Sequence, residues 1–300
     1  MTDESYSRME AEQAAPLEVA GDASVKGERE RRIVGLNAVT FVIVLALNGL
    51  AGSGKLTGTS IGAVSNDFPT YITPAGFAFS IWGVIYTCMA LFVLYGFSSQ
   101  ARASARLFPR GGEGVGLAFA ASNVLNVLWI VLFTQNKTAF VWASSAFIFA
   151  LLAALLVVYV RCGCWTHAFD YKQRGWPAIA ELVGLDIGFS LYSGWVSVAC
   201  IINIAAPGGN GGSALAGAAA QEGWSCTMLA IAALINTAVV LRRHDPVFPL
   251  VLAWACNAIR TQHYASSVTT ASTSVAIFGL LLSATAIALR VRCASRKAQQ

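Results

Sequence analysis

Aromatic and amide side chains recur at helical spacing in several apolar stretches of the sequence. The clearest stretch is FSLYSGWVSVACIINI, which places four residues at positions i, i+3, i+7 and i+11: Tyr192, Trp195, Ala199 and Asn203. Eleven residues make about three turns of an α-helix, so one face carries all four. A flat apolar wall with a few hydrogen-bonding groups is typical of a site for a planar amphipathic molecule.

Two further stretches carry related faces. NVLW places Asn126 and Trp129 on one helix face, and SIWGVIY does the same for Trp82 and Tyr86. A simpler interpretation is that the aromatic rings contact lipid and that each amide bonds a neighbouring helix, worth about 0.6 kcal/mol in a bilayer. Because the pattern recurs on three segments, we interpret these residues as candidates for ligand binding. A bound tetrapyrrole would be a ligand, and no separate cofactor is expected.

Two carboxylates precede the clearest stretch. Glu181 lies eleven residues before Tyr192 and is therefore predicted on the same stripe, whereas Asp186 lies about 120° away on an α-helix. A carboxylate near the middle of a membrane helix costs about 2.5–3.5 kcal/mol and often marks an ion or proton path. Glu181 and Asp186 are therefore candidates for ion coupling. If the helix begins late, Asp186 is instead an interfacial residue.

Other motifs give weaker indications of chemistry. Cys162, Cys164 and His167 form C-x-C-x-x-H, but a fourth ligand is not evident, so no metal site is predicted. GLAGSGKLT resembles a phosphate-binding loop, yet Leu56 follows Lys55 where such a loop needs Ser or Thr. No pair of nucleophile and base is visible, so we expect a protein that is not an enzyme.

The composition indicates the class of protein that positions these residues. The chain is 56% hydrophobic and 12% charged, with a mean hydropathy of +0.61, whereas soluble domains carry about 25% charged residues. Apolar runs of about 18 residues or more mark transmembrane helices, so we predict an all-α integral membrane protein. The candidate spans are 34–51, 74–96, 115–135, 139–160, 179–205, 223–241, 247–262 and 269–289. The seventh is short and the eighth begins with Ser and Thr, so the number of spans is seven or eight. Thr73 is predicted to cap the second span, with Pro74 as its first residue.

The distribution of basic residues predicts the orientation. Only Lys55, Lys137 and Arg260 of the 20 Lys and Arg residues fall in loops on one side. Cytoplasmic loops are enriched in Lys and Arg, so both termini are predicted to be cytoplasmic. The net charge of +5 then reflects topology, and no nucleic-acid partner is expected. Residues 1–33 are predicted to form a disordered tail and residues 291–300 a short basic tail.

Three motifs in order resemble the TspO/translocator-protein family, also called tryptophan-rich sensory proteins. TPAGFAFSIWGVIY is similar to the family's second-helix signature, P-P-G-W-V-F-x-x-V-W-x-x-L-Y. NVLW matches N-x-L-W of the third helix, and YSGWVSVACIIN matches Y-x-x-W-V-x-x-A-x-x-L-N of the fifth. The resemblance covers residues 34–206, and the helices of residues 207–290 place the chain with longer members of the family.

This resemblance implies a five-helix transmembrane bundle with about three further helices. It implies that Trp82, Asn126, Trp129, Tyr192 and Ala199 line a pocket, that residues 52–73 cover it, and that the ligand is a porphyrin or sterol. The family's Gly-Trp is Ala75-Gly76 here, so one aromatic wall is missing unless Phe77 replaces it.

The predicted function is therefore to bind, and so sense or carry, a hydrophobic planar ligand such as a tetrapyrrole or sterol. A secondary transporter that couples protons or ions to a small solute is the main alternative. A scaffold whose last three helices bind a partner is another. The lipid bilayer is an expected partner, and a homodimer remains open.

Overall fold

The computed structural model describes residues 3–104, 106–108, 115–166, 175–205, 218–262 and 265–298, and every regular element within these ranges is a helix. The prediction of an all-α fold is confirmed. In chain order the elements are α1 (Asp3–Gly52), α2 (Ile61–Asp67), η1 (Gly76–Ser80), α3 (Ile81–Gly96), α4 (Ser99–Ala103), α5 (Ala118–Phe133), α6 (Thr138–Arg161), α7 (Trp176–Ala180), η2 (Glu181–Ile187), α8 (Gly188–Ala205), α9 (Ala218–Arg243), α10 (Phe248–Arg260) and α11 (Ser266–Ala298).

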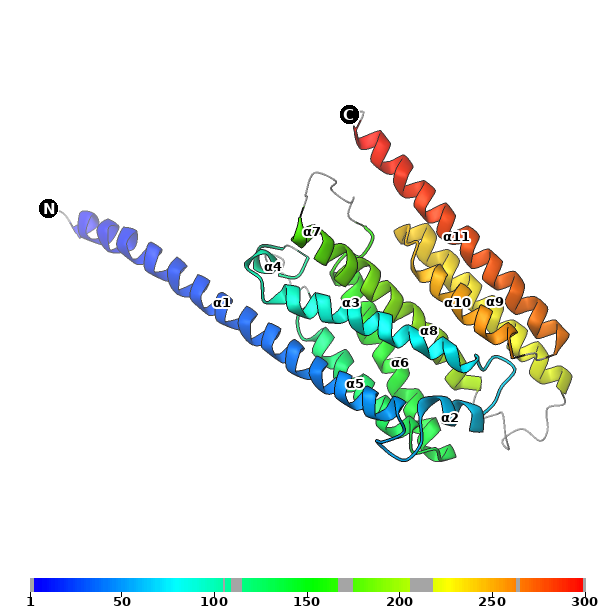
Figure 1. Cartoon of the computed structure of the whole chain (residues 1–300). Coiled ribbons are helices and arrows are strands. Elements are labelled where there is room, and N and C mark those ends of the chain that lie inside the picture. Colours follow the sequence, from blue (N-terminus) through cyan, green and yellow to red (C-terminus); the bar gives the residue numbers. More distant parts are fainter. Residues whose placement is uncertain are drawn as a thin grey trace.

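The long helices run side by side in one bundle. Figure 1 shows α1 along one side, α9, α10 and α11 along the other, and α3, α5, α6 and α8 between them. The helix through α7, η2 and α8 is central, since 67% of its most apolar stretch is buried within the protein, against 17% for α11. Both chain ends project from the same end of the bundle (Figure 1), as an even number of crossings requires.

Six helices within the described residues are long and apolar enough to cross a membrane. They correspond to six of the eight predicted spans. The other two predicted spans are α5 and α10, which have 16 and 13 residues. A helix usually needs about 20 residues to cross the hydrocarbon core. These two apolar helices therefore fill the bundle without meeting that length.

The second predicted span begins differently from the sequence-based expectation. Gly76–Ser80 forms a 3₁₀-helix and the α-helix starts only at Ile81. The predicted cap was wrong, because the Thr73 hydroxyl accepts a hydrogen bond from the Thr70 N–H instead. A tertiary contact accompanies this geometry: the Ala75 N–H donates to the carbonyl of Ala258 in α10.

The N-terminal segment also differs from the expectation. Residues 1–33 were predicted to be disordered, whereas α1 is helical from Asp3. The segment is rich in Ala, Glu and Arg, which are strong helix formers.

The segment of residues 207–290 contributes α9, α10 and α11, which pack on the rest of the bundle. The two parts approach closely at Gly194 of α8, where an added Cβ would meet Val251 of α10 at 3.2 Å. Trp254 of α10 donates from its indole to the carbonyl of Ala78 in η1, at 3.1 Å. Helix α10 therefore fixes the position of the segment from Ala75 to Ala78. The predicted boundary between residues 206 and 207 lies outside the described residues.

Candidate functional site

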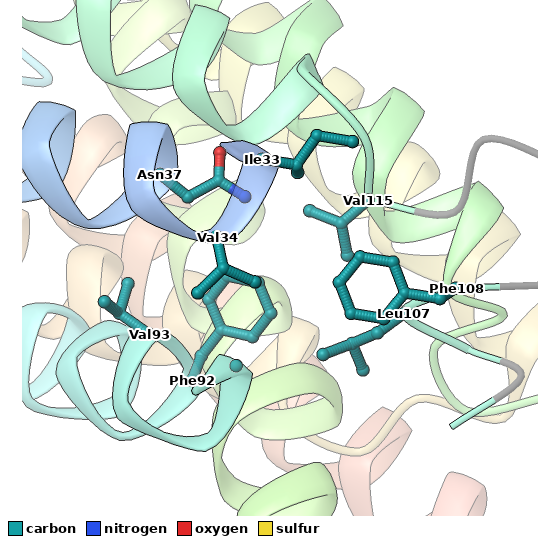
Figure 2. Close-up of a pocket in the computed structure, with 9 residues that line it drawn as sticks. Ile33, Val34, Asn37, Phe92, Val93, Leu107, Phe108 and Val115 are labelled. Atoms are coloured by element: carbon teal, nitrogen blue, oxygen red, sulfur yellow. The ribbon is translucent and has the colours of Figure 1, made fainter. Parts of the chain in front are cut away.

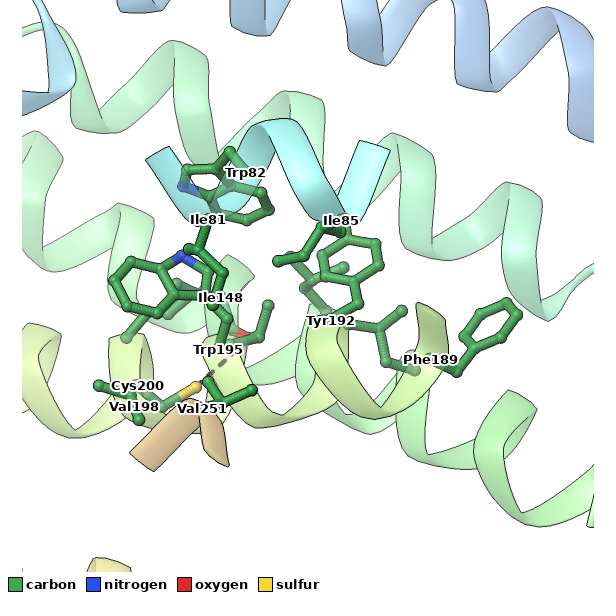
Figure 3. Packing of buried hydrophobic residues seen from close by; sticks show 14 of the residues in the cluster. Ile81, Trp82, Ile85, Ile148, Phe189, Tyr192, Trp195, Val198, Cys200 and Val251 are labelled. Atoms are coloured by element: carbon green, nitrogen blue, oxygen red, sulfur yellow. Dashed lines mark hydrogen bonds between the residues drawn. The ribbon is translucent and has the colours of Figure 1, made fainter. Parts of the chain in front are cut away.

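Aromatic rings from α3, α5 and α8 meet in the middle of the bundle. Figure 3 shows Trp82 of α3 facing Tyr192 and Trp195 of α8. Its ring centroid lies 5.8 Å from that of Tyr192 and 6.4 Å from that of Trp195, both edge to face. Trp129 of α5 lies 5.9 Å from Trp82, and Tyr86 stacks on it at 5.4 Å. The structure thus brings together the aromatic residues that the three sequence motifs singled out.

A chain of side-chain hydrogen bonds joins α1, α5 and α8 beside these rings. The Asn48 amide donates to Oδ1 of Asn126 at 2.7 Å, and the Asn126 amide donates to the hydroxyl of Tyr192 at 2.9 Å. All three side chains are buried. Asn48 was not among the predicted site residues, although its position eleven residues after Asn37 on one face of α1 was a detectable signal.

A cavity of about 440 Å³ opens next to this group. Asn48 and Gly49 of α1 form one wall, and Trp82 and Tyr86 of α3 form another. The predicted cover of residues 52–73 forms a third wall with Gly52 at the end of α1 and with Ser60, Ile61 and Gly62. The helix η1 adds Gly76 and Phe79 to the lining. The volume is within the range of about 300–1,000 Å³ that is usual for small-molecule sites.

Only Trp82 and Tyr86 of the eight predicted ligand-binding residues line this cavity. Trp129, Tyr192 and Trp195 are packed behind Trp82 and are at most 3% exposed. The space between the helices that the aromatic stripes suggested is therefore filled by the rings themselves.

Two predicted residues lie farther along α8. Asn203 donates within its own helix to the carbonyl of Ala199 at 2.9 Å, and both residues are buried. Phe77 does not replace the missing aromatic wall. Its ring packs edge to face on Trp254 of α10 at 5.4 Å because α10 lies directly beside η1.

Three buried donors in the aromatic cluster lack a protein acceptor. Within the described residues, the indole nitrogens of Trp82 and Trp129 and the hydroxyl of Tyr86 make no hydrogen bond. A buried N–H without a partner costs roughly 1–3 kcal/mol, so such groups call for an explanation. At Trp82, which lines the cavity, the nitrogen itself is enclosed by protein, so a bound molecule would reach this donor only after the indole ring turns.

A second cavity lies between α1, α3 and the segment before α5, and Figure 2 shows its lining. Asn37 is its one amide, and the other side chains that line it are apolar, among them Phe92 and Val115. Its volume of about 20 Å³ has room for about one water molecule. It is therefore too small for a planar ligand.

The two predicted ion-coupling carboxylates bind a shared arginine. Arg106 reaches both oxygens of Asp186, at 2.6 and 3.1 Å, and lies 3.5 Å from Glu181. Glu181 also accepts hydrogen bonds from the hydroxyls of Tyr95 at 3.0 Å and Ser104 at 2.6 Å. Glu181 is thus directed away from the Tyr192 stripe on which it was predicted.

The cause is local backbone geometry. Glu181–Ile187 forms a π-helix, which has more residues per turn than an α-helix, so the eleven-residue rule does not apply across it. Glycine also lets this segment approach α3 closely, since a Cβ on Gly184 would lie 3.0 Å from the backbone of Phe92.

From the sequence, Arg106 was one of the basic residues on the predicted cytoplasmic side, and no further role was predicted for it. Burial acts to lower the pKa of Arg106, but hydrogen bonds and charge attraction from Asp186 and attraction from Glu181 raise it above its ordinary value. The guanidinium is therefore a permanent cation between two acids. Arg106 also donates to the carbonyl of Cys162 at 3.0 Å, and this hydrogen bond connects the segment before α5 to the end of α6.

A third carboxylate, Asp245, is fully buried and joins the last helices to the rest of the bundle. Its Oδ2 accepts hydrogen bonds from Tyr159 of α6 at 2.7 Å and Ser190 of α8 at 2.6 Å, and its Oδ1 accepts from the N–H of Val247 and of Phe248. Burial raises the pKa of the Asp245 carboxyl, against the opposing effect of these hydrogen bonds. The sequence analysis did not identify this residue.

The two cysteines of the C-x-C-x-x-H motif lie inside the protein. Cys162 and Cys164 are buried, and burial raises the pKa of Cys162 to about 12. The Cys164 thiol donates to the carbonyl of Leu185 at 3.5 Å. His167 lies outside the described residues. Within those residues no group of three or more His, Cys, Asp or Glu side chains could hold a metal ion.

Comparison with known proteins gives one match over most of the chain. A family model described as TSPO-like protein matches residues 33–290, from within α1 to within α11. No curated protein and no solved structure matches the chain significantly.

Proposed function

Because the chain belongs to the TSPO-like protein family, we propose that it binds a hydrophobic planar ligand within the membrane and senses or carries it. A tetrapyrrole or a sterol fits this description. The proposal rests on the cavity between α1, α2 and α3, whose lining combines the rings of Trp82 and Tyr86 with the polar side chains of Asn48 and Ser60. Such a site combines an aromatic wall with a few polar groups that orient the ligand.

Each part of the lining has a role in this proposal. The rings of Trp82 and Tyr86 provide flat apolar contact, and aromatic pairs of this kind contribute about 0.5–1.5 kcal/mol beyond burial alone. Once the Trp82 ring turns toward the cavity, its indole N–H would donate to a carboxylate, hydroxyl or carbonyl of the ligand. Four glycines, Gly49, Gly52, Gly62 and Gly76, keep the cavity wide because they present no side chain to it.

A route for sensing follows from the same contacts. Trp82 touches Trp129 of α5 and Tyr192 and Trp195 of α8. A ligand that moves the Trp82 ring would therefore change the packing of both helices. The short helix α2 covers the cavity and is anchored in the core by Ile61 and Val64, so entry of the ligand beneath it would require these contacts to open.

The other functional classes have less support. Ion coupling by Asp186 and Glu181 would require these acids to change charge, and both are held by the permanent cation Arg106. Catalysis would require a nucleophile and a base near the ligand, and the side chains that line the cavity include neither His nor a charged residue. We therefore propose binding rather than transport or catalysis.

Titration with protoporphyrin in lipid nanodiscs, followed by quenching of tryptophan fluorescence, tests the proposal. Saturable quenching at micromolar ligand is expected in the wild type. Gly49→Leu should weaken binding at least about tenfold, because an added side chain at this position meets no protein atom within 4 Å and enters the cavity.

Gly35→Leu is the matched control, since it makes the same change on the same helix away from the cavity, also with nothing within 4 Å. Its titration should resemble that of the wild type. Quenching that does not saturate, or that Gly49→Leu leaves unchanged, would mean that the porphyrin only partitions into lipid and would overturn the proposal.

A further inference from the structure

A groove distinct from the ligand cavity lies where α1, α5 and α6 meet at one end of the bundle. Its volume is about 500 Å³. Each helix contributes one stripe of residues at helical spacing: Arg29, Arg32, Ile33 and Leu36 from α1, Leu117, Ala118 and Ala121 at the start of α5, and Val157 and Arg161 at the end of α6. We propose that this groove binds one phospholipid with an anionic headgroup.

The charge of the groove matches such a headgroup. Arg29, Arg32 and Arg161 all line it, and among the described residues its lining includes no acidic side chain. Glu28 offsets one of these charges, because it pairs with Arg32 at 2.6 Å on the surface of α1. The described lining therefore carries more positive than negative charge. Guanidinium groups form bidentate hydrogen bonds with phosphate. In a zwitterionic headgroup the negative charge of the phosphate is balanced by the headgroup's own cation, so the attraction to arginine is weaker.

The apolar part of the groove matches an acyl chain. Leu36, Leu117 and Val157 line it and are 44%, 60% and 40% exposed in the protein. Ala121 also lines the groove, and its small side chain leaves space there for an acyl chain. Burying apolar side chains of this kind contributes about 25 cal/mol per Å². A free phosphate ion would leave this surface uncovered, so the groove fits a lipid better than an inorganic anion.

The start of α5 adds a favourable electrostatic field. Gly116 and Leu117 form part of the lining, and no side chain caps the first turn of α5. A helix N-terminus carries a partial positive charge and attracts phosphate. The arginines and the helix end therefore act in the same direction on the same headgroup.

The position along the membrane is consistent with this ligand. Arg161 is the last residue of α6, and Arg29 and Arg32 lie near the start of the apolar part of α1. These residues are on the side that the distribution of basic residues predicts to be cytoplasmic. Anionic lipids are enriched in the cytoplasmic leaflet, and each Lys or Arg near that surface contributes about fivefold in affinity.

Native mass spectrometry of the full chain in detergent tests the proposal with three added probes: dioleoylphosphatidylglycerol, dioleoylphosphatidylcholine and inorganic phosphate. The wild type should retain one phosphatidylglycerol in preference to phosphatidylcholine, and millimolar phosphate should not displace it. The triple variant Arg29→Gln, Arg32→Gln, Arg161→Gln should bind phosphatidylglycerol at least about fivefold more weakly, because it removes three guanidinium groups from the groove.

A charge-matched control is Arg31→Gln, Arg242→Gln, Arg292→Gln, which removes three exposed arginines that do not line the groove. It should bind like the wild type. Ala121→Phe keeps the three groove arginines and fills the apolar part, so it should also weaken binding. This second variant guards against a triple variant that does not fold.

Several results would overturn the proposal. Equal retention of both lipids would mean that the groove binds lipid only through apolar contacts and does not select the headgroup. Displacement by phosphate would mean that the groove is a site for a free anion. Equal loss in the charge-matched control would attribute binding to overall charge. Wild-type binding by Ala121→Phe would place the lipid elsewhere.

Discussion

Replacing Arg106 by Met should strongly destabilise the protein. Arg106 and Asp186 have side chains that are each 13% exposed, and their guanidinium and carboxylate form two hydrogen bonds, at 2.6 and 3.1 Å. Glu181, the second acid, lies 3.5 Å away. Loss of one partner from a buried ion pair costs about 3–5 kcal/mol, because the other charge stays buried without compensation.

The remaining contacts of the two acids set the expected value within this range. Asp186 keeps a hydrogen bond from the N–H of Trp165 at 2.9 Å, and Glu181 keeps those from Tyr95 and Ser104. These neutral donors replace part of the lost stabilisation. We therefore expect a loss near the lower limit, about 3 kcal/mol in the free energy of unfolding.

Unfolding by titration of sodium dodecyl sulfate into detergent micelles, followed by tryptophan fluorescence, measures this quantity. Asp186→Asn and the double variant complete a double-mutant cycle. The double variant should be more stable than the sum of the single losses predicts, by at least about 1.5 kcal/mol, because it removes both charges of the pair. A loss below about 1 kcal/mol for Arg106→Met, or additivity within about 0.5 kcal/mol, would refute the reasoning.

The same variants separate the two functional alternatives. Asp186→Asn should keep the protoporphyrin titration of the wild type, since Asp186 does not line the ligand cavity. A variant that folds but loses binding or solute movement in step with the charge at position 186 would favour an ion-coupled transporter.

Gly184→Ala should lose about 1–3 kcal/mol in the same unfolding assay, because its Cβ would lie 3.0 Å from the backbone of Phe92 and force η2 away from α3. Gly83→Ala, where nothing lies within 4 Å, should be neutral or stabilising, and equal losses in the two variants would contradict the packing argument. The pKa of Asp245 is raised by burial, so its contribution to stability is fully present below the unfolded value of about 3.9 and is lost as pH rises through the folded value. The stability of the wild type relative to Asp245→Asn should therefore fall as pH rises above about 4, and a constant or rising difference would show that the carboxylate is not penalised by burial.

The fold class and the membrane setting follow from local properties of the sequence. A run of about 18 apolar residues with few charges is most stable as a helix in lipid, whatever it packs against. The shared faces of Tyr192 with Trp195 and of Asn126 with Trp129 follow from helical periodicity alone. For this reason all eight predicted apolar segments are helices, although α5 and α10 are short.

The site itself depended on tertiary structure. Periodicity identified which rings share a face, but it did not determine that Trp129, Tyr192 and Trp195 fill the space between the helices while Trp82 and Tyr86 line an open cavity. That outcome depends on how closely the helices approach. Glycines such as Gly184 and Gly194, placed against neighbouring helices, set that distance.

The buried polar network shows the same limit most clearly. Arg106 and Asp186 are 80 residues apart in sequence, and Tyr159 and Asp245 are 86 apart. No local pattern links such pairs, because their contact exists only after loops and helices have packed. The π-helix of Glu181–Ile187 adds a further reason: it changes the rotation per residue, so even the position of Glu181 around its own helix was decided by the folded structure and not by the spacing of residues.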